Sequence, residues 1–130
     1  MNAEQTVLLV TYLASSAVMV ACGIPLFRRR IGRNKWLGFR TKLSMSDDAM
    51  WYATNRAAGV WLIVTGIGTA LAAGAASFIG MNDIESATLV TGGMLTGITL
   101  CVLASLAEQR RVLDERNHGD FSEVDAGRHV

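Results

Sequence analysis

The chain has 130 residues, a formal net charge of +1, 51% hydrophobic residues and 18% charged residues. Three long stretches, 5–27, 57–82 and 86–107, contain no charged side chain. This segregation excludes a nucleic-acid binder with an extended basic face, a disordered acidic chain and a disulfide scaffold. A helix that spans a bilayer needs about 20 mostly apolar residues. We therefore predict an all-α membrane protein with three transmembrane helices.

The first apolar stretch, 5–27, is the first predicted span. A cleaved signal peptide is the alternative, but residues 1–5 contain no basic side chain and the apolar run is longer than the core of a signal peptide. Arg28, Arg29 and Arg30 follow directly, as is typical of a stop-transfer flank. We expect this helix to be retained.

The segment 28–56 is predicted to be a loop at the inner membrane surface. Its first part is basic, and each base near such a surface attracts anionic lipid by about 1 kcal/mol. We predict that five of these bases contact lipid headgroups: Arg28, Arg29, Arg30, Arg33 and Lys35.

The end of this loop has the pattern of a helix start. Ser44 or Ser46 can act as the N-cap, and Asp47 and Asp48 lie in the first turn, where the helix dipole favours negative charge. We predict a short juxtamembrane helix from about Asp47 that either runs directly into the second span or bends near Gly59.

The second and third apolar stretches, 57–82 and 86–107, are predicted to be antiparallel neighbours because only a few residues join them. Small residues let helix backbones approach closely in lipid. They recur at intervals of four in both stretches, as Gly66, Ala70 and Gly74 and as Gly93 and Gly97. We predict that the two stripes face each other within one chain; a seam between two copies of the chain is the alternative.

Beyond the third span the chain is polar. Residues 108–117 are predicted to continue the helix, and Gly119 is a plausible stop. We expect one membrane domain over residues 1–117 and a flexible tail over residues 118–130.

The charges also predict an orientation. All twelve Lys and Arg residues flank the inner ends of the predicted spans, whereas Glu4, Asp83 and Glu85 lie at the opposite ends. Because bases accumulate in cytoplasmic loops, we expect a multi-pass plasma-membrane protein with its N-terminus outside and its C-terminus in the cytoplasm.

The spans contain no ionisable Asp, Glu, Lys, Arg or His side chain, which argues against a pump or a coupled transporter. Cys22 and Cys101 are predicted to be inert packing thiols, and His118 and His129 lack the spacing of metal ligands. The loop contains no nucleophile–base pair and no phosphate-binding glycine loop. We therefore predict no enzymatic activity, no metal and no cofactor.

A spaced pattern of residues connects the loop to the second span. It comprises Asn34, Gly38, Arg40, Thr41, Trp51, Asn55, Arg56 and Gly59. The pattern resembles the signature of the SdpI family, membrane proteins named for immunity to a sporulation-delaying peptide toxin. The resemblance covers roughly residues 23–74 and fits a short, three-helix form.

This resemblance implies a membrane protein that confers immunity to a membrane-active peptide toxin or senses it, and that can hold a regulatory protein at the membrane. The inner loop would be the docking face, with Arg40, Asn55 and Arg56 as its polar contacts. A purely structural role is the alternative for these residues. The alternative function is an accessory or structural subunit that joins a larger membrane complex through its glycine stripes, with homo-oligomers also possible. No nucleic-acid partner is expected.

Overall fold

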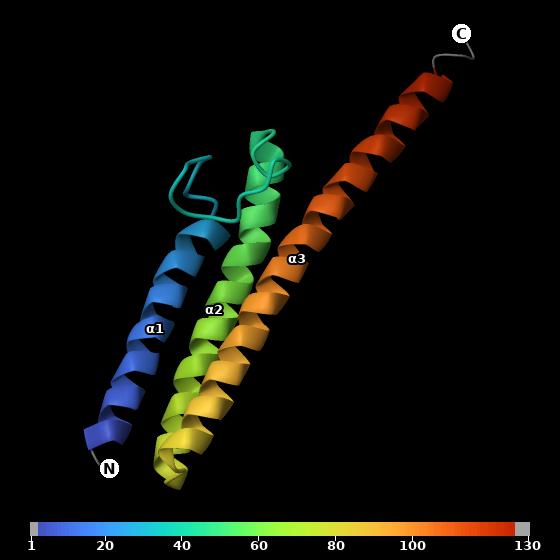
Figure 1. The fold of residues 1–130 in the computed structure, drawn as a ribbon. Helices are drawn as coiled ribbons and strands as arrows, with labels where there is room; N and C mark the ends of the chain where they lie inside the picture. The colour runs from blue at the N-terminus through green and yellow to red at the C-terminus, as the bar shows by residue number, and fades with distance from the viewer. Residues whose placement is uncertain (1–2, 127–130) are drawn as a thin grey trace.

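The computed structural model describes residues 3–126, with side chains described through His118. It contains three helices, α1 (Ala3–Phe27), α2 (Asp48–Ile79) and α3 (Asp83–Ala126), and no strand within the described residues (Figure 1). Each helix is long and apolar enough to cross a membrane. The prediction of an all-α protein with three membrane-spanning helices is confirmed.

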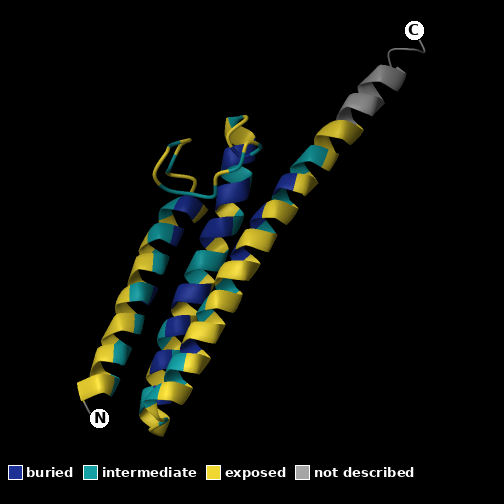
Figure 2. Ribbon diagram, in the orientation of Figure 1, coloured by how far each residue is buried: buried dark blue, intermediate teal, exposed yellow. Residues whose placement is uncertain are grey.

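Helix α2 is the centre of the bundle. It packs against both other helices along its length, whereas α1 and α3 make little contact with each other. Figure 2 shows the buried residues concentrated on α2, while α1 and α3 expose much of their surface. Large apolar side chains such as Val7, Leu71 and Leu95 are exposed on all three helices. These faces suit the hydrocarbon of a bilayer, so the chain is a multi-pass membrane protein.

The interface between α1 and α2 is built from small residues spaced seven apart. Ser16 and Gly23 of α1 lie opposite Gly66 and Gly59 of α2 in an antiparallel arrangement. A Cβ added to Gly59 would lie 2.5 Å from the backbone nitrogen of Phe27, and the Ser16 hydroxyl donates to the Gly66 carbonyl at 2.6 Å. The two backbones are therefore in direct contact.

The structure does not bring the two predicted glycine stripes together. Gly66 faces α1 rather than α3, and Gly74 and Gly93 have no neighbour within 4 Å of an added Cβ. Only Gly97 is close to α2, where an added Cβ would overlap Thr65. The prediction was wrong because α2 is the central helix and uses its small residues for contact with α1 as well.

The start of α2 differs in detail from the prediction. Asp47, rather than Ser44 or Ser46, is the N-cap, and its side chain accepts the backbone N–H of Met50 at 2.9 Å. The expected juxtamembrane helix is the first part of α2, which continues without interruption through Gly59.

The end of α3 also differs from the prediction. The helix passes Gly119, the expected stop, and ends at Ala126. A single glycine costs a helix only about 1 kcal/mol relative to alanine, and no proline follows to end it. The predicted flexibility of the tail, residues 118–130, stays a prediction. His129 lies outside the described residues.

Candidate functional site

Residues 28–47, here called the motif loop, join α1 to α2 and fold back over the ends of these helices (Figure 1). The loop has no helix or strand of its own. Its shape is therefore set by side chains that bond its backbone, and most residues of the spaced sequence pattern do this.

Asn55 and Trp51, both in α2, form hydrogen bonds with the backbone of the motif loop. Trp51 is fully buried, and its indole N–H donates to the carbonyl of Ile31 at 2.9 Å. Asn55 is 2% exposed; its amide oxygen accepts the backbone N–H of Phe39 at 2.6 Å, and its amide nitrogen donates to the Trp51 carbonyl at 3.0 Å. A buried N–H group without a hydrogen-bond partner destabilises the fold by about 1–3 kcal/mol. The bond from the Phe39 N–H to Asn55 therefore stabilises the conformation of the loop.

Gly38 and Asn34 shape the loop itself. Gly38 has a φ of +116°, and an added Cβ would overlap the amide oxygen of Asn55. Only glycine allows both this backbone conformation and this close approach. The side-chain oxygen of Asn34 accepts the N–H groups of Trp36 and Leu37, each at 2.8 Å, and so forms the preceding turn.

Thr41 connects the loop to α3. The Ser44 N–H donates to the Thr41 hydroxyl at 3.0 Å, and the Thr41 N–H donates to the Ser44 hydroxyl at 2.8 Å. The side-chain amide of Gln109 also donates to the Thr41 hydroxyl, at 2.8 Å. Ser44 and Gln109 are both buried.

Sequence reasoning missed the roles of Ser44 and Gln109. One signal for Gln109 was present, because Cys101, Ser105 and Gln109 are spaced four apart and all three are buried on one face of α3. Cys101 packs there as predicted, with its thiol 3.6 Å from the carbonyl of Ala58.

Two ion pairs fasten the outer side of the loop. The Nε of Arg33 lies 2.7 Å from a carboxylate oxygen of Asp48, and the contact of Arg33 with lipid stays a prediction. Arg116 of α3 donates two hydrogen bonds to the Asp47 carboxylate, at 2.8 and 3.0 Å. The Arg116 hydrogen bonds, followed by the bond from the Met50 N–H, hold the pKa of Asp47 well below its usual range.

Two residues of the pattern point outward. The guanidinium of Arg40 is exposed and donates to the Lys35 carbonyl, and Arg56 lies over the Phe27 ring, 5.5 Å from its centroid. Trp36, four residues before Arg40, is 91% exposed. The loop thus has an interior that fixes its shape and an outer face that is basic and aromatic.

The other bases predicted to contact lipid are also exposed, namely Arg28, Arg29, Arg30 and Lys35. Their contact with lipid stays a prediction. Within the described residues, no group of three or more His, Cys, Asp or Glu side chains is placed to hold a metal ion.

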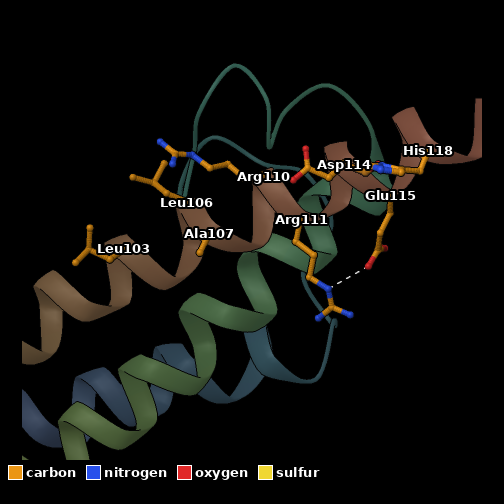
Figure 3. Close-up of a pocket in the computed structure, with 8 residues that line it drawn as sticks. All are labelled: Leu103, Leu106, Ala107, Arg110, Arg111, Asp114, Glu115 and His118. Carbon is orange, nitrogen blue, oxygen red and sulfur yellow. Dashed lines mark hydrogen bonds and ion pairs between the residues drawn. The ribbon is translucent and has the colours of Figure 1, made fainter. Parts of the chain in front are cut away.

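A hollow of about 620 Å³ lies along α3, from the end of its apolar part into its polar extension (Figure 3). Residues of α3 alone line it, from Leu103 to His118, and Arg111 pairs there with Glu115 at 3.0 Å. A hollow with walls from one helix cannot enclose a ligand, so the motif loop remains the better candidate site.

The fold and the loop together define a small multi-pass membrane protein with a prebuilt loop over one end of its bundle. A model of the SdpI/YfhL protein family matches residues 30–107, more than half of the chain and all of the spaced pattern. The chain therefore belongs to the SdpI/YfhL family, as the resemblance indicated. No curated protein and no solved structure gives a match.

Proposed function

We propose that this protein confers immunity to a membrane-active peptide toxin, or senses it, and that the outer face of the motif loop is the docking face. Membership of the SdpI/YfhL family is the observation that carries the proposal. The rigid loop supports it, because a face that is already ordered loses less conformational entropy when a partner binds.

The docking face is formed by Trp36, Arg40 and Lys42, which are all exposed. Tryptophan and arginine are the residue types that most often dominate binding energy at interfaces. The basic side chains favour a partner with an acidic segment, either a peptide or a regulatory protein. Asn55, predicted from sequence as a binding residue, is a positioning residue in this proposal because it is buried beneath the loop.

The proposal includes an orientation in the plasma membrane. The motif loop and the polar end of α3 face the cytoplasm, and the N-terminus and the α2–α3 turn face outward, since the bases lie at the loop end. A reporter that is active only in the cytoplasm, fused after residue 130, should be active; the same reporter fused at residue 1 should be inactive. The reverse pattern would contradict the orientation.

Survival of bacterial cells challenged with a panel of membrane-active peptides tests the function. Cells that express the chain should survive at least one peptide better than cells without it. The double variant Trp36→Ala, Arg40→Ala should lose this protection. The matched variant Arg30→Ala, Met45→Ala, which also removes one base and one exposed apolar side chain from the loop, should retain it. Equal survival of cells with and without the chain, for every peptide in the panel, would contradict the proposal.

A second candidate function is that of an accessory subunit of a larger membrane complex. It is favoured by glycines of α2 and α3 that do not pack against another helix of this chain. Gly68, Gly74, Gly92 and Gly93 are exposed and have no atom within 4 Å of an added Cβ. They leave room for close approach by another helix. Purification in a mild detergent tests this candidate, which fails if the chain runs alone and as a monomer.

Neither candidate function includes an enzymatic step, in keeping with the expectation from the sequence.

A further inference from the structure

A hollow of about 230 Å³ lies beside the motif loop, where the ends of α1 and the middle of α3 approach α2. Three of its lining residues are charged and three are apolar. The lining residues are Arg29, Ala53, Arg56, Ala57, Val60 and Glu108.

Arg29 and Arg56 are the two arginines of this region that line the hollow, and neither is paired with a carboxylate. Among the described residues, neither guanidinium has a hydrogen-bond or ion-pair partner, whereas Arg33 and Arg116 are committed to aspartates. Arg56 is held in place by its position over the Phe27 ring. Two arginines without a carboxylate partner therefore line one hollow.

The hollow lies where the basic loop meets the apolar spans, which is where we expect a lipid phosphate. Arg29 is two residues past the end of α1, and Arg56 is the last charged residue before the apolar stretch of α2. Directly along α2, Val60 and Val64 are 39% and 54% exposed and lie on one helix face. An acyl chain can follow this face into the membrane.

We propose that this hollow is a binding site for an anionic phospholipid. Arg29 and Arg56 donate hydrogen bonds to its phosphodiester, which guanidinium groups bind well because of their planar, forked geometry. Its acyl chain packs along Val60 and Val64. Basic pockets between transmembrane helices at the cytoplasmic side are a general form of lipid recognition.

Glu108 narrows the choice of headgroup. Glu108 lines the same hollow, and a carboxylate oxygen of Glu108 lies 4.0 Å from the Arg111 guanidinium outside it. The lining residues Arg29, Arg56 and Glu108 together carry a formal charge of +1. A phosphodiester has one negative charge, and a hydroxyl group on the headgroup can donate to the carboxylate. Phosphatidylglycerol has both features, so the site takes this lipid in preference to phosphatidylcholine. The site does not depend on the proposed docking of a toxin.

Lipid retention by the purified full chain, measured by native mass spectrometry from a mild detergent, tests this site. The protein should retain phosphatidylglycerol about tenfold better than phosphatidylcholine. The variant Arg29→Gln, Arg56→Gln should lose that preference, by about tenfold. The variant Arg28→Gln, Arg30→Gln has the same charge but alters arginines that do not line the hollow, so it should lose less of the preference than Arg29→Gln, Arg56→Gln does. Equal losses in the two variants would overturn the proposal.

A measurement on the unaltered protein keeps the test decisive if a variant does not fold. Phosphatidylglycerol with a photoactivatable acyl chain should crosslink mainly to the α2 segment that contains Val60 and Val64. Crosslinks spread evenly over all three helices would overturn the proposal. Excess inorganic phosphate should not displace the lipid; displacement would show a site for free anions instead and would also overturn it.

Discussion

The two helix interfaces of this protein are built differently. Between α1 and α2, Gly59 and Gly23 bring the backbones into contact, and the Ser16 hydroxyl bonds a carbonyl across the interface. Between α2 and α3, a hollow of about 300 Å³ remains beside Thr65 and Gly97. In the α1–α2 interface the two backbones touch at small residues. In the α2–α3 interface the backbones are farther apart beside this hollow, and contact is made by side chains such as Thr65.

This difference shows that small residues stabilise a membrane bundle only where their positions meet. Lipid tails are as apolar as leucine, so helices associate through packing and hydrogen bonds rather than through the hydrophobic effect. Gly59 and Gly66 have partners on α1, whereas Gly74 and Gly93 have open space beside them. The stability of a helix interface therefore depends less on how many glycines a helix contains than on whether they lie opposite the neighbouring helix.

Replacing Gly59 by alanine should have the largest effect. The added Cβ would lie 2.5 Å from the Phe27 nitrogen and 2.8 Å from the Gly23 oxygen, so the helices must separate. Overpacking of this kind costs about 1–3 kcal/mol. Thermal unfolding in detergent should show a lower midpoint for Gly59→Ala than for the unaltered protein.

Gly74→Ala is the matched control, because its Cβ meets nothing within 4 Å. Alanine is the better helix former, so this variant should unfold no more easily than the unaltered protein. If both variants lost the same stability, the difference between the two interfaces would be refuted.

The next effect concerns the motif loop, which rests on the α1–α2 side of the bundle. Asn55→Ala should leave the Phe39 N–H without its partner and cost about 1–3 kcal/mol. Trypsin should then cleave faster within residues 28–42, where all seven Lys and Arg residues of the motif loop lie.

Asn117→Ala removes an exposed amide from α3 and provides the control. Its cleavage rate in the loop should match that of the unaltered protein. An unchanged rate in Asn55→Ala would show that the loop does not depend on this side chain.

The spans could be predicted from sequence because a bilayer demands long apolar stretches, and charges mark where each stretch ends. The register of the helices could not. Ser16, Gly23, Gly59 and Gly66 are paired by three-dimensional contact at intervals of seven, and the sequence also offers glycines at intervals of four. Nothing in the spacing alone selects one set over the other.

The pattern of the motif loop was visible in the sequence, but the part played by each residue was not. Asn55 and Arg40 both look like polar binding residues, yet one is buried beneath the loop and the other is exposed. Their difference depends on contacts across 16 residues of chain, such as the bond from Phe39 to Asn55. Local sequence rules do not reach that far.

A smaller effect is expected from Ser16→Ala, which removes the hydrogen bond to Gly66 across the close interface. Such bonds between membrane helices contribute about 0.6 kcal/mol on average, less than the packing around Gly59. Ser15→Ala is the control, because the Ser15 hydroxyl bonds only a carbonyl of its own helix. If Ser16→Ala were as damaging as Gly59→Ala, hydrogen bonding rather than backbone packing would hold α1 on α2.

The smallest effect should come from Arg116, which fastens the more open side by pairing with the exposed carboxylate of Asp47. This pair lowers the pKa of Asp47, so its stabilisation is complete above the ordinary aspartate pKa of about 3.9 and is lost as the pH falls toward the lowered value. Arg116→Ala should therefore unfold at a lower temperature than the unaltered protein at pH 7, and the gap should shrink below about pH 4. Arg110→Ala should show no such gap, because within the described residues Arg110 has no ion-pair partner. A gap for Arg116→Ala that did not change with pH would mean that the arginine stem holds α3 by packing rather than by charge.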